Sequence, residues 1–544
     1  MWNLCEIGFV VNLIAIRLNL KLTTMEEVYY PIGEQNFEKI ITGGWLYVDK
    51  TGFLKYFLRG GYFFLGRPRR FGKSLFLSTL RYFFEGRRDL FKGLAADSLK
   101  WDWAPHPVFY LDLNAWGYYE SNAIDQALDT HLKEWEEKYN VNVDCFEDFS
   151  TRLRNVIRKA FETTGKRVVI LVDEYDKPLV NTLDDKNRFE ANRNKLATFY
   201  SGFKSCAEFI HLLFLTGVSR FGKVSIFSGL NNIQDISVLK QYNAICGISE
   251  SELDNNFRVG LHKYAENWGW NVDQVKSVLK KWYDGYHFSE GAEDIYNPFS
   301  LLLALDRCRT ENFWIDSGGK PTVLIEPLKK YGIDLNVFFN VKCTREELTG
   351  IEIDSSQPIA LFYQSGYLTI KGYDPFADLY TLGIPNGEVK RGFLQYLFPL
   401  YTSLKKQDVA FNVYQFVLEF ESGNVEGFMK RLTSLFASVP YEMEMHSERN
   451  VHNALLMLMI LVGLNVQTEY RTSDGRIDLF VKTQKYYYII ELKLDGTAEE
   501  ALEQIRRKNY ALPFASDGRD IMAIGASFSK QTRTIDSWKS SLLN

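Results

Sequence analysis

The feature that most restricts the fold of this chain is a strand, loop and helix pattern between residues 62 and 84. A short apolar run, Tyr62 to Leu65, leads into the basic loop RPRRFGKS at residues 67 to 74, and the helical pattern SLFLSTLRYFF follows directly from Ser74. In this order the backbone N–H groups of the loop and of the first helical turn can face one anion. The pattern therefore predicts a phosphate-binding unit.

Further apolar runs and helical patterns alternate along the next part of the chain. Apolar runs lie at Val108 to Leu113, Val168 to Val172 and Leu212 to Leu215. Helical patterns at Ala123 to Tyr139 and Phe146 to Thr163 separate them. Strands that alternate with long helices predict a parallel α/β sheet.

Three residues at the end of the basic loop carry the chemistry expected of a P-loop. Gly72 lets backbone N–H groups approach a phosphate, Lys73 neutralises the β and γ oxygens of ATP, and the Ser74 hydroxyl ligates Mg²⁺. A strict G-x-x-x-x-G-K-[ST] pattern needs glycine at Arg67, whereas the glycine here is Gly66, one residue earlier. We expect either a modified turn or a weaker grip on the phosphate.

Acidic residues after the run VVILV supply the metal side of such a site. We expect Asp173 to hold Mg²⁺ through water and Glu174 to orient or activate the attacking water. Thr216 is a candidate sensor of the γ-phosphate, and Arg220 with Lys223 is a candidate source of positive charge. Either motif alone is also typical of a turn or of a helix start with favourable acids. Together they favour nucleotide binding.

A second set of chemical residues lies near the end of the chain, in IDLF and IIELK. Because strand side chains alternate between faces, Glu491 and Lys493 project to one side of the run Tyr486 to Leu492, while Leu492 points the other way. If the preceding strand ends at Asp478, the two carboxylates can bind one hard cation such as Mg²⁺. Lys493 can then position a water or balance transition-state charge. This is the outline of a site that hydrolyses phosphodiesters.

Three further residues are candidates for the surroundings of this metal site. Glu448, at the start of the apolar helical pattern Asn450 to Val462, is a candidate additional carboxylate for the metal. Gln504 and Tyr510, on the helical pattern after IIELK, are placed to flank a nucleic-acid backbone. Each of the three, like the Asp, Glu and Lys set itself, is also typical of an ordinary surface.

Length and charge limit the organisation and the partners. At 544 residues the chain exceeds what one hydrophobic core usually organises, so we expect two to four domains. The formal net charge of −4 gives no general attraction to nucleic acid, so contact with a polyanion must come from local clusters such as Arg67, Arg69 and Arg70. Of these we assign Arg70 to the nucleotide site.

The cysteines and the N-terminal residues indicate a compartment. Six widely spaced cysteines without a Cys-x-x-Cys pair fit a reducing cytoplasm better than a zinc site. The opening residues lack a basic start and a small-residue cleavage pattern, and they are too short and too polar to span a bilayer. We expect a cytoplasmic protein without a membrane partner, and we interpret residues 1–24 as an N-terminal extension.

Two groups of segments resemble known families. YPIGEQNFEKI, VDKTGFL, RPRRFGKSLFLSTL, LVDEYDKPL and LTGVSRFGKVSIFSGLNN resemble the AAA-ATPase-like family of prokaryotic proteins. The tail RIDLFVKT…YYYIIELKLDGTAEEALEQI resembles the PD-(D/E)xK nuclease domain commonly fused behind it. The resemblance implies a P-loop ATPase core joined to a restriction-endonuclease-like domain that acts on DNA. Arginine at the position of Arg67 is habitual in this group.

The resemblance and the residue patterns together predict an α/β protein in four parts. They are an extension at 1–24, an AAA-ATPase-like P-loop domain with a parallel sheet at 25–240, a helical lid and winged-helix-like region at 241–405, and an α/β nuclease-like domain at 406–544. In the last part we expect helices at 413–436, 447–462 and 498–510, with strands at 466–470, 476–482, 486–492 and 521–525. A hairpin is expected around GYLTIKGYD…LYTLGIPN.

The leading hypothesis is a nuclease that is driven or gated by ATP. Its cofactors are ATP with one Mg²⁺ at the P-loop and one or two Mg²⁺ ions at the nuclease site, with Mn²⁺ as an alternative metal. DNA is the expected partner, and a homo-oligomer is an open alternative. A second hypothesis is a nucleotide-controlled switch or DNA-binding regulator whose nuclease-like fold does not cut. A third is an ATPase that docks a protein partner through its aromatic middle region.

Overall fold

The structure is a computed structural model. It describes residues 28–114, 116–118, 120, 122–142, 148–183, 185–219, 232–317, 341–349, 359–401, 406–437, 455, 457–458, 465–472, 475–516 and 518–543. Among these residues no helix combines the length and the apolar character needed to span a bilayer.

The chain divides into two compact units, and each is described by itself. Unit 1 takes in the chain up to Phe313 together with Glu346–Ile353 and Gln364–Ile370. Unit 2 takes in Trp314–Arg345, Asp354–Tyr363 and Lys371–Asn544. The four-part division expected from the sequence remains a prediction.

A five-stranded parallel sheet forms the centre of unit 1, in the order β2-β3-β4-β1-β5. The strands are β1 (Gly61–Gly66), β2 (Val108–Asp112), β3 (Val168–Asp173), β4 (Ile210–Gly217) and β5 (Gln234–Asp235). Every residue of β3 and β4 is buried, as expected for strands rich in valine, isoleucine and leucine that are covered on both faces. The parallel α/β sheet predicted from the sequence is confirmed.

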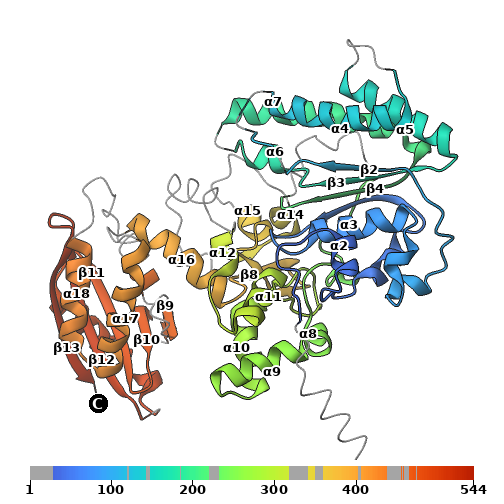
Figure 1. The fold of residues 1–544 in the computed structure, drawn as a ribbon. Coiled ribbons are helices and arrows are strands. Elements are labelled where there is room, and N and C mark those ends of the chain that lie inside the picture. Colours follow the sequence, from blue (N-terminus) through green and yellow to red (C-terminus); the bar gives the residue numbers. More distant parts are fainter. Residues whose placement is uncertain are drawn as a thin grey trace, which may run out of the picture. The chain divides into compact units, whose positions relative to one another are not determined.

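Helices cover both faces of this sheet (Figure 1). On one side lie α4 (Ala123–Tyr139), α5 (Phe149–Thr164) and α7 (Lys186–Ser205), and on the other lie α2 (Phe37–Thr42) and α3 (Lys73–Phe84). The bounds of α4 agree with the predicted helix. The shorter elements of this part are η1 (Thr51–Tyr56), η2 (Arg88–Phe91), η3 (Ala95–Ser98), α6 (Lys177–Val180), η4 (Ala207–Phe209) and η5 (Lys240–Tyr242).

The start of α5 differs from the predicted Phe146 because a side chain caps the helix at a later position. The carboxylate of Asp148 accepts a hydrogen bond from the backbone N–H of Thr151. An N-cap carboxylate satisfies one of the four unpaired N–H groups of the first turn. The first helical residue is therefore Phe149.

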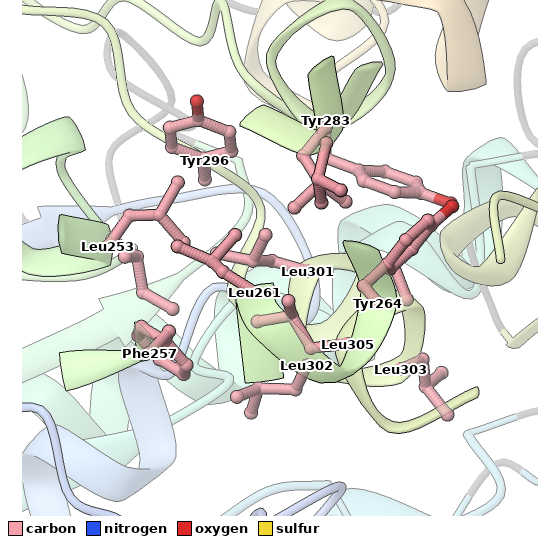
Figure 2. Packing of buried hydrophobic residues seen from close by; sticks show 14 of the residues in the cluster. Leu253, Phe257, Leu261, Tyr264, Tyr283, Tyr296, Leu301, Leu302, Leu303 and Leu305 are labelled. Carbon is pink, nitrogen blue, oxygen red and sulfur yellow. The ribbon is translucent and has the colours of Figure 1, made fainter. Parts of the chain in front are cut away.

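Four helices after the sheet build a second apolar core in unit 1. They are α8 (Glu250–Asn256), α9 (Arg258–Trp268), α10 (Val272–Tyr283) and α11 (Pro298–Arg307). Reciprocal side-chain and backbone hydrogen bonds cap the starts of α8 and α10. Figure 2 shows how leucine and aromatic side chains of these helices meet. The helical region expected after residue 240 is present.

The segment from residue 313 to 401 contributes short helices and a small sheet. Its elements are α12 (Phe313–Ser317), β6 (Val341–Cys343), α14 (Arg345–Thr349), α15 (Ile359–Gln364), β7 (Thr369–Asp374), β8 (Leu379–Gly383) and α16 (Gly387–Tyr401). The three strands pair in the order β6-β8-β7. Strands β7 and β8 form the hairpin predicted from the sequence.

A mixed five-stranded sheet forms the C-terminal part of unit 2, in the order β13-β12-β11-β10-β9. Its strands are β9 (Asn465–Thr472), β10 (Gly475–Lys482), β11 (Tyr486–Leu494), β12 (Asp520–Ser529) and β13 (Thr534–Leu543). Helix α20 (Ala498–Arg507) connects the parallel pair β11 and β12, and η7 (Leu512–Phe514) follows it. The sequence analysis missed β13, because this edge strand is mostly polar and exposed and lacks an apolar run.

Two helices replace the single helix predicted at residues 413–436. They are α17 (Lys406–Ser422) and α18 (Val425–Ala437), and Gly423 between them has a left-handed φ of +74° that ends the first helix. The predicted helix 498–510 ends earlier, at Arg507, so Tyr510 lies beyond it. Most of the helix predicted at 447–462 lies outside the described residues.

Candidate functional sites

The loop between β1 and α3 lies at the carboxyl ends of the parallel strands. This edge is where α/β sheets commonly bind ligands. Register places the terminal residues Asp112 and Asp173 side by side, and Leu65 beside Thr216. Left-handed φ values occur in the loop at Arg70 (68°) and Gly72 (94°). The glycine before Lys73 is thus explained by backbone conformation.

Arg67 has a structural position that the sequence did not indicate. Its side chain is 1% exposed, and its guanidinium donates to the backbone carbonyls of Ser237 (2.7 Å) and Tyr242 (3.0 Å). It also lies 4.1 Å from the ring centroid of Phe288. The expected polyanion contact of Arg67 is therefore wrong, because the guanidinium is buried and bonded to carbonyls. Arg67 is not among the left-handed residues of the loop, so glycine is not required there.

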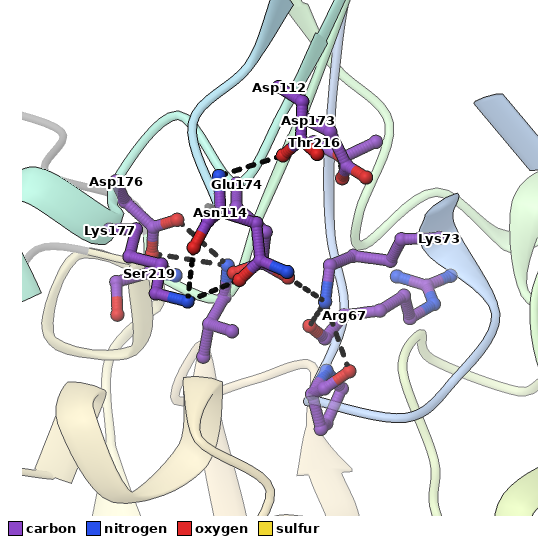
Figure 3. Close-up of polar contacts among 12 residues, drawn as sticks. Arg67, Lys73, Asp112, Asn114, Asp173, Glu174, Asp176, Lys177, Thr216 and Ser219 are labelled. Carbon is purple, nitrogen blue, oxygen red and sulfur yellow. Dashed lines mark hydrogen bonds and ion pairs between the residues drawn. The ribbon is translucent and has the colours of Figure 1, made fainter. Parts of the chain in front are cut away.

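Lys73 begins α3 with its side chain folded back onto the loop. Nζ donates to the carbonyls of Arg67 (3.0 Å) and Pro68 (3.2 Å) and lies 3.4 Å from Oε1 of Glu174 (Figure 3). The side chain is 3% exposed. Two carbonyl oxygens and a carboxylate thus surround the ammonium.

Glu174 follows β3 with a left-handed φ of 52°. Burial by itself would raise the pKa of this carboxyl, but the cations of Lys73, Arg69 and Lys177 outweigh it and lower the pKa. Glu174 is therefore ionised at neutral pH. An ionised carboxylate at this position can accept a proton from water.

Asp173 is buried at the end of β3 and is hydrogen-bonded by neighbouring hydroxyls. It accepts from Thr216 Oγ1 (2.7 Å) and from the hydroxyl of Tyr110 (3.2 Å), and Ser74 also bonds to it. Burial, then the charge of Glu174, raises the pKa of Asp173. The predicted metal pair, Asp173 and Ser74, is thus brought together. The Thr216 hydroxyl, the candidate sensor of the γ-phosphate, is thus donated to Asp173.

Several residues at this edge were not singled out from the sequence. Lys177 Nζ donates to the carbonyl of Asn114 at 3.1 Å and to its side-chain oxygen, and burial lowers the pKa of Lys177. Asp176 accepts from the backbone N–H groups of Val218 and Ser219 (Figure 3). The signal for Asp176 and Lys177 was present in the segment LVDEYDKPL, where only Tyr175 separates them from the two predicted acids.

Other predicted residues lie farther from this cluster or outside the described chain. Arg70 is exposed, and its guanidinium lies 5.0 Å from the ring centroid of Phe299. Arg220, Lys223 and Glu448 lie outside the described residues.

The second candidate site lies on β10, β11 and α20 in unit 2. Strands β10 and β11 are antiparallel, and Oδ2 of Asp478 accepts the backbone N–H of Leu492 at 3.0 Å. Glu491 and Lys493 face α20, where Gln504 donates its amide N–H to Glu491 Oε1 and accepts from Lys493 Nζ at 2.6 Å. The predicted shared face of the two β11 residues is confirmed.

Tyr510 also belongs to this region. It is buried after the end of α20, and its hydroxyl donates to the carbonyl of Arg476 at 2.8 Å. Burial raises the pKa of Tyr510, and the charges of Glu491 and Asp478 act in the same direction. Tyr510 therefore supports the backbone of β10 two residues before Asp478.

Glu491 is electrostatically unsatisfied. Its side chain is 1% exposed, its Oε2 has no hydrogen-bond partner among the described residues, and Lys493 Nζ lies 3.5 Å from Oε1. Burial, then the nearby charge of Asp478, raises the pKa of Glu491 to about 7. A divalent cation bound by the two carboxylates would offset both causes of the raised pKa, because its positive charge stabilises the ionised carboxylate.

The residues present fit a hard cation only in part. Two carboxylates, one with an oxygen that no described residue bonds, are suitable oxygen ligands for Mg²⁺ or Mn²⁺. Within the described ranges no group of three or more His, Cys, Asp or Glu side chains is arranged to hold a metal. Such an ion would therefore depend on these two carboxylates together with water or a substrate oxygen.

Comparison with known proteins finds a family match for two stretches of the chain. Residues 31–227 match the family model described as "Predicted AAA-ATPase", and residues 446–538 match the "PD-(D/E)XK nuclease superfamily". A protein of Azotobacter chroococcum mcd 1, described as "Uncharacterized protein in vnfD 5'region", is 34% identical over 522 residues, which cover 93% of this chain and 97% of that protein. No solved structure matches.

Proposed function

Because this chain belongs to the AAA-ATPase-like family with a C-terminal PD-(D/E)XK nuclease superfamily domain, we propose that ATP bound at the loop of unit 1 controls phosphodiester cleavage in unit 2. The observation that carries the proposal is the buried Oε2 of Glu491, which has no hydrogen-bond partner among the described residues and lies in a carboxyl group influenced by the charge of Asp478 and beside Lys493. Such a set is poor as a purely structural cluster, because a buried carboxylate oxygen has no partner in the part of the chain that the structure describes.

At the nuclease site each residue has a separate task. Asp478 and Glu491 would hold Mg²⁺, which polarises the phosphate and lowers the pKa of a bound water. Lys493 supplies positive charge where negative charge develops in the transition state. Gln504 bridges Glu491 and Lys493 and so fixes the orientation of both.

At the nucleotide site the cations of the loop would bind the phosphates. Lys73 would exchange the carbonyls of Arg67 and Pro68 for phosphate oxygens, and the backbone N–H groups at the start of α3 would face the same anion. Asp173 and Ser74 would hold the Mg²⁺ that accompanies ATP. Glu174, kept ionised by its cationic neighbours, would accept the proton of the attacking water.

DNA is the proposed substrate, and cleavage of plasmid DNA by the full-length protein tests the function. The assay compares Mg²⁺ and Mn²⁺, with and without ATP, with EDTA as the control. We expect metal-dependent nicking or linearisation whose rate changes when ATP is added. DNA binding without cleavage under every metal condition would instead support a nucleotide-controlled switch. Parallel reactions with single-stranded DNA and with RNA test the choice of nucleic acid.

A further inference from the structure

A distant segment of unit 1 lies directly against the nucleotide loop. Gly366 has a left-handed φ of +88°, and a Cβ added to it would come within 2.7 Å of Cβ and 2.9 Å of Cγ of Pro68. The same hypothetical Cβ would lie 3.5 Å from the ring of Tyr286. The backbone at residue 366 therefore approaches the loop as closely as a glycine allows.

The segment Tyr286 to Phe288 joins the same loop from another direction. The ring of Phe71 lies 4.8 Å from that of Tyr286 and 5.5 Å from that of Phe288, in edge-to-face geometry. The guanidinium of Arg67 lies over the ring of Phe288. Arg67 at the start of the loop and Phe71 within it thus both contact this short segment.

One hydroxyl group joins the two segments. Thr369 Oγ1 accepts the backbone N–H of His287 at 2.7 Å and donates to the carbonyl of the same residue at 3.0 Å. Thr369 is 1% exposed, so both bonds are shielded from water. Because an unpaired backbone group is costly in such a place, the hydroxyl holds the two segments in one register.

Thr369 is also the first residue of β7, and the chain passes from unit 1 to unit 2 within this strand, between Ile370 and Lys371. The far end of the hairpin is ordered by Asp374, which accepts the backbone N–H groups of Phe376 (2.9 Å) and Ala377 (3.2 Å). Strand β7 thus connects Thr369, in unit 1, to the part of the hairpin that belongs to unit 2.

We propose that Thr369 is a positioning residue that transmits the state of the nucleotide loop to β7 and through it to unit 2. A bound phosphate must draw Lys73 Nζ away from the carbonyls of Arg67 and Pro68, which frees the loop to move. Movement of Pro68 is passed to Gly366, because the two are in contact without a side chain between them. The control of cleavage in this scheme rests on the proposed function, whereas the link from loop to strand does not.

Hydrogen exchange of the full-length protein tests the link without any reference to cleavage. In the parent protein, Mg²⁺ with a non-hydrolysable ATP analogue is expected to change the exchange rate of residues 364–374 by about fivefold or more. Thr369→Val removes the hydroxyl and is expected to abolish that change, while Thr369→Ser retains it. Thr381→Val, a matched threonine change on the neighbouring strand β8, should leave the response intact. A parent-like response in Thr369→Val, or no response in the parent, overturns the inference.

Plasmid cleavage with and without ATP separates this inference from the proposed function. ATP-dependent cleavage that persists unchanged in Thr369→Val overturns the role of Thr369 and leaves the proposed function in place. Exchange that responds to nucleotide in a parent whose cleavage ignores ATP overturns the proposed control and leaves the link in place. If thermal melting shows that Thr369→Val does not fold, Gly366→Ala replaces it. That variant is expected to weaken analogue binding, and parent-like binding together with a parent-like exchange response overturns the inference.

Discussion

The two candidate sites each bury a glutamate near an aspartate and a lysine, yet their electrostatics are opposite. Burial raises the pKa of Glu491 to about 7, whereas the cations around Glu174 lower its pKa despite its burial. The difference lies in the number of cations. Lys73, Arg69 and Lys177 all act on Glu174, while Lys493 is shared with Gln504 and its side chain is 32% exposed. The site around Glu174 is therefore suited to an anion, and the site around Glu491 is suited to a cation.

The largest loss of DNA cleavage is expected from Glu491→Gln. The amide keeps the shape of the side chain but removes the negative charge that a metal needs, so we expect metal-dependent DNA cleavage to fall by about 100-fold or more. ATP binding, measured with a fluorescent analogue, should be unchanged. Glu503→Gln, an exposed glutamate on α20, is the matched control. Parent-like cleavage by Glu491→Gln would remove the nuclease assignment.

Lys73→Ala tests whether the loop of unit 1 binds the phosphates of ATP. Loss of the buried ammonium removes the cation expected to contact the β and γ phosphates, so ATP affinity should fall by about tenfold or more. The near-ultraviolet circular dichroism should remain that of a folded protein, and Lys55→Ala, at an exposed lysine, should bind ATP like the parent. Unchanged nucleotide affinity in Lys73→Ala contradicts the P-loop assignment.

Gln504→Ala tests whether the amide orients the nuclease residues. Without it Glu491 and Lys493 lose a shared partner, and we expect cleavage to fall by about 10-fold to 100-fold, as is typical when a group that orients a metal ligand is removed. Titration with Mn²⁺ should show weaker metal binding in the same variant. Cleavage and metal affinity equal to the parent would show that the bridge is dispensable.

Between pH 8 and pH 6 the affinity for metal at Glu491 should change more than the affinity for ATP, although by less than in the variants above. Metal binding needs the carboxylate form of Glu491, whose pKa is about 7, so the affinity for Mn²⁺ should fall by up to about tenfold for each pH unit below that value. Glu174 has a lowered pKa, so it should add no comparable loss of ATP affinity between pH 8 and pH 6. Calorimetric titrations at both pH values measure this, and equal metal affinities would contradict the assigned environment of Glu491.

The raised pKa of Glu491 also makes the stability of the metal-free protein depend on pH. Because the folded state binds the Glu491 proton more tightly than the unfolded chain, in which the pKa is near 4.5, the contribution of this group to stability falls as pH rises from about 4.5 to about 7. Divalent metal should oppose the fall above pH 7. Melting temperatures of the parent and of Glu491→Gln measure both effects, and the variant should lack them.

The smallest effect on activity is expected from Arg67→Lys. The two carbonyls of Ser237 and Tyr242 accept from two different guanidinium nitrogens, which lysine lacks, so the free energy of unfolding should fall by about 1–2 kcal/mol. Arg59→Lys, at an exposed position, should be neutral. Chemical denaturation measures the difference. A change in ATP affinity as large as that of Lys73→Ala would indicate that Arg67 binds phosphate after all.

Several elements were predictable because their signals are local in the sequence. The bounds of α4 follow from its helical periodicity, β3 follows to within one residue from a continuous apolar run, and Glu491 and Lys493 share a face because strand side chains alternate. A polar edge strand and the division between two consecutive helices were harder to predict from the sequence. Strand β13 carries no apolar run, and the division between α17 and α18 depends on one glycine conformation.

Contacts between distant residues could not be predicted in the same way. Arg67 meets the carbonyl of Ser237 across 170 positions, and Thr369 meets His287 across 82. Such pairs are set by which elements pack together and in what register. The partners of Arg67 corrected an expectation that rested on charge alone.

The sequence by itself predicted the two chemistries, since glycine, lysine and serine at a helix start suit a phosphate and two carboxylates on adjacent strands suit a cation. Tertiary structure decided the charge state and the connections of each site. Burial and neighbouring charges shift a pKa through space, so Glu174 and Glu491 could be told apart only after folding had surrounded them with different numbers of cations.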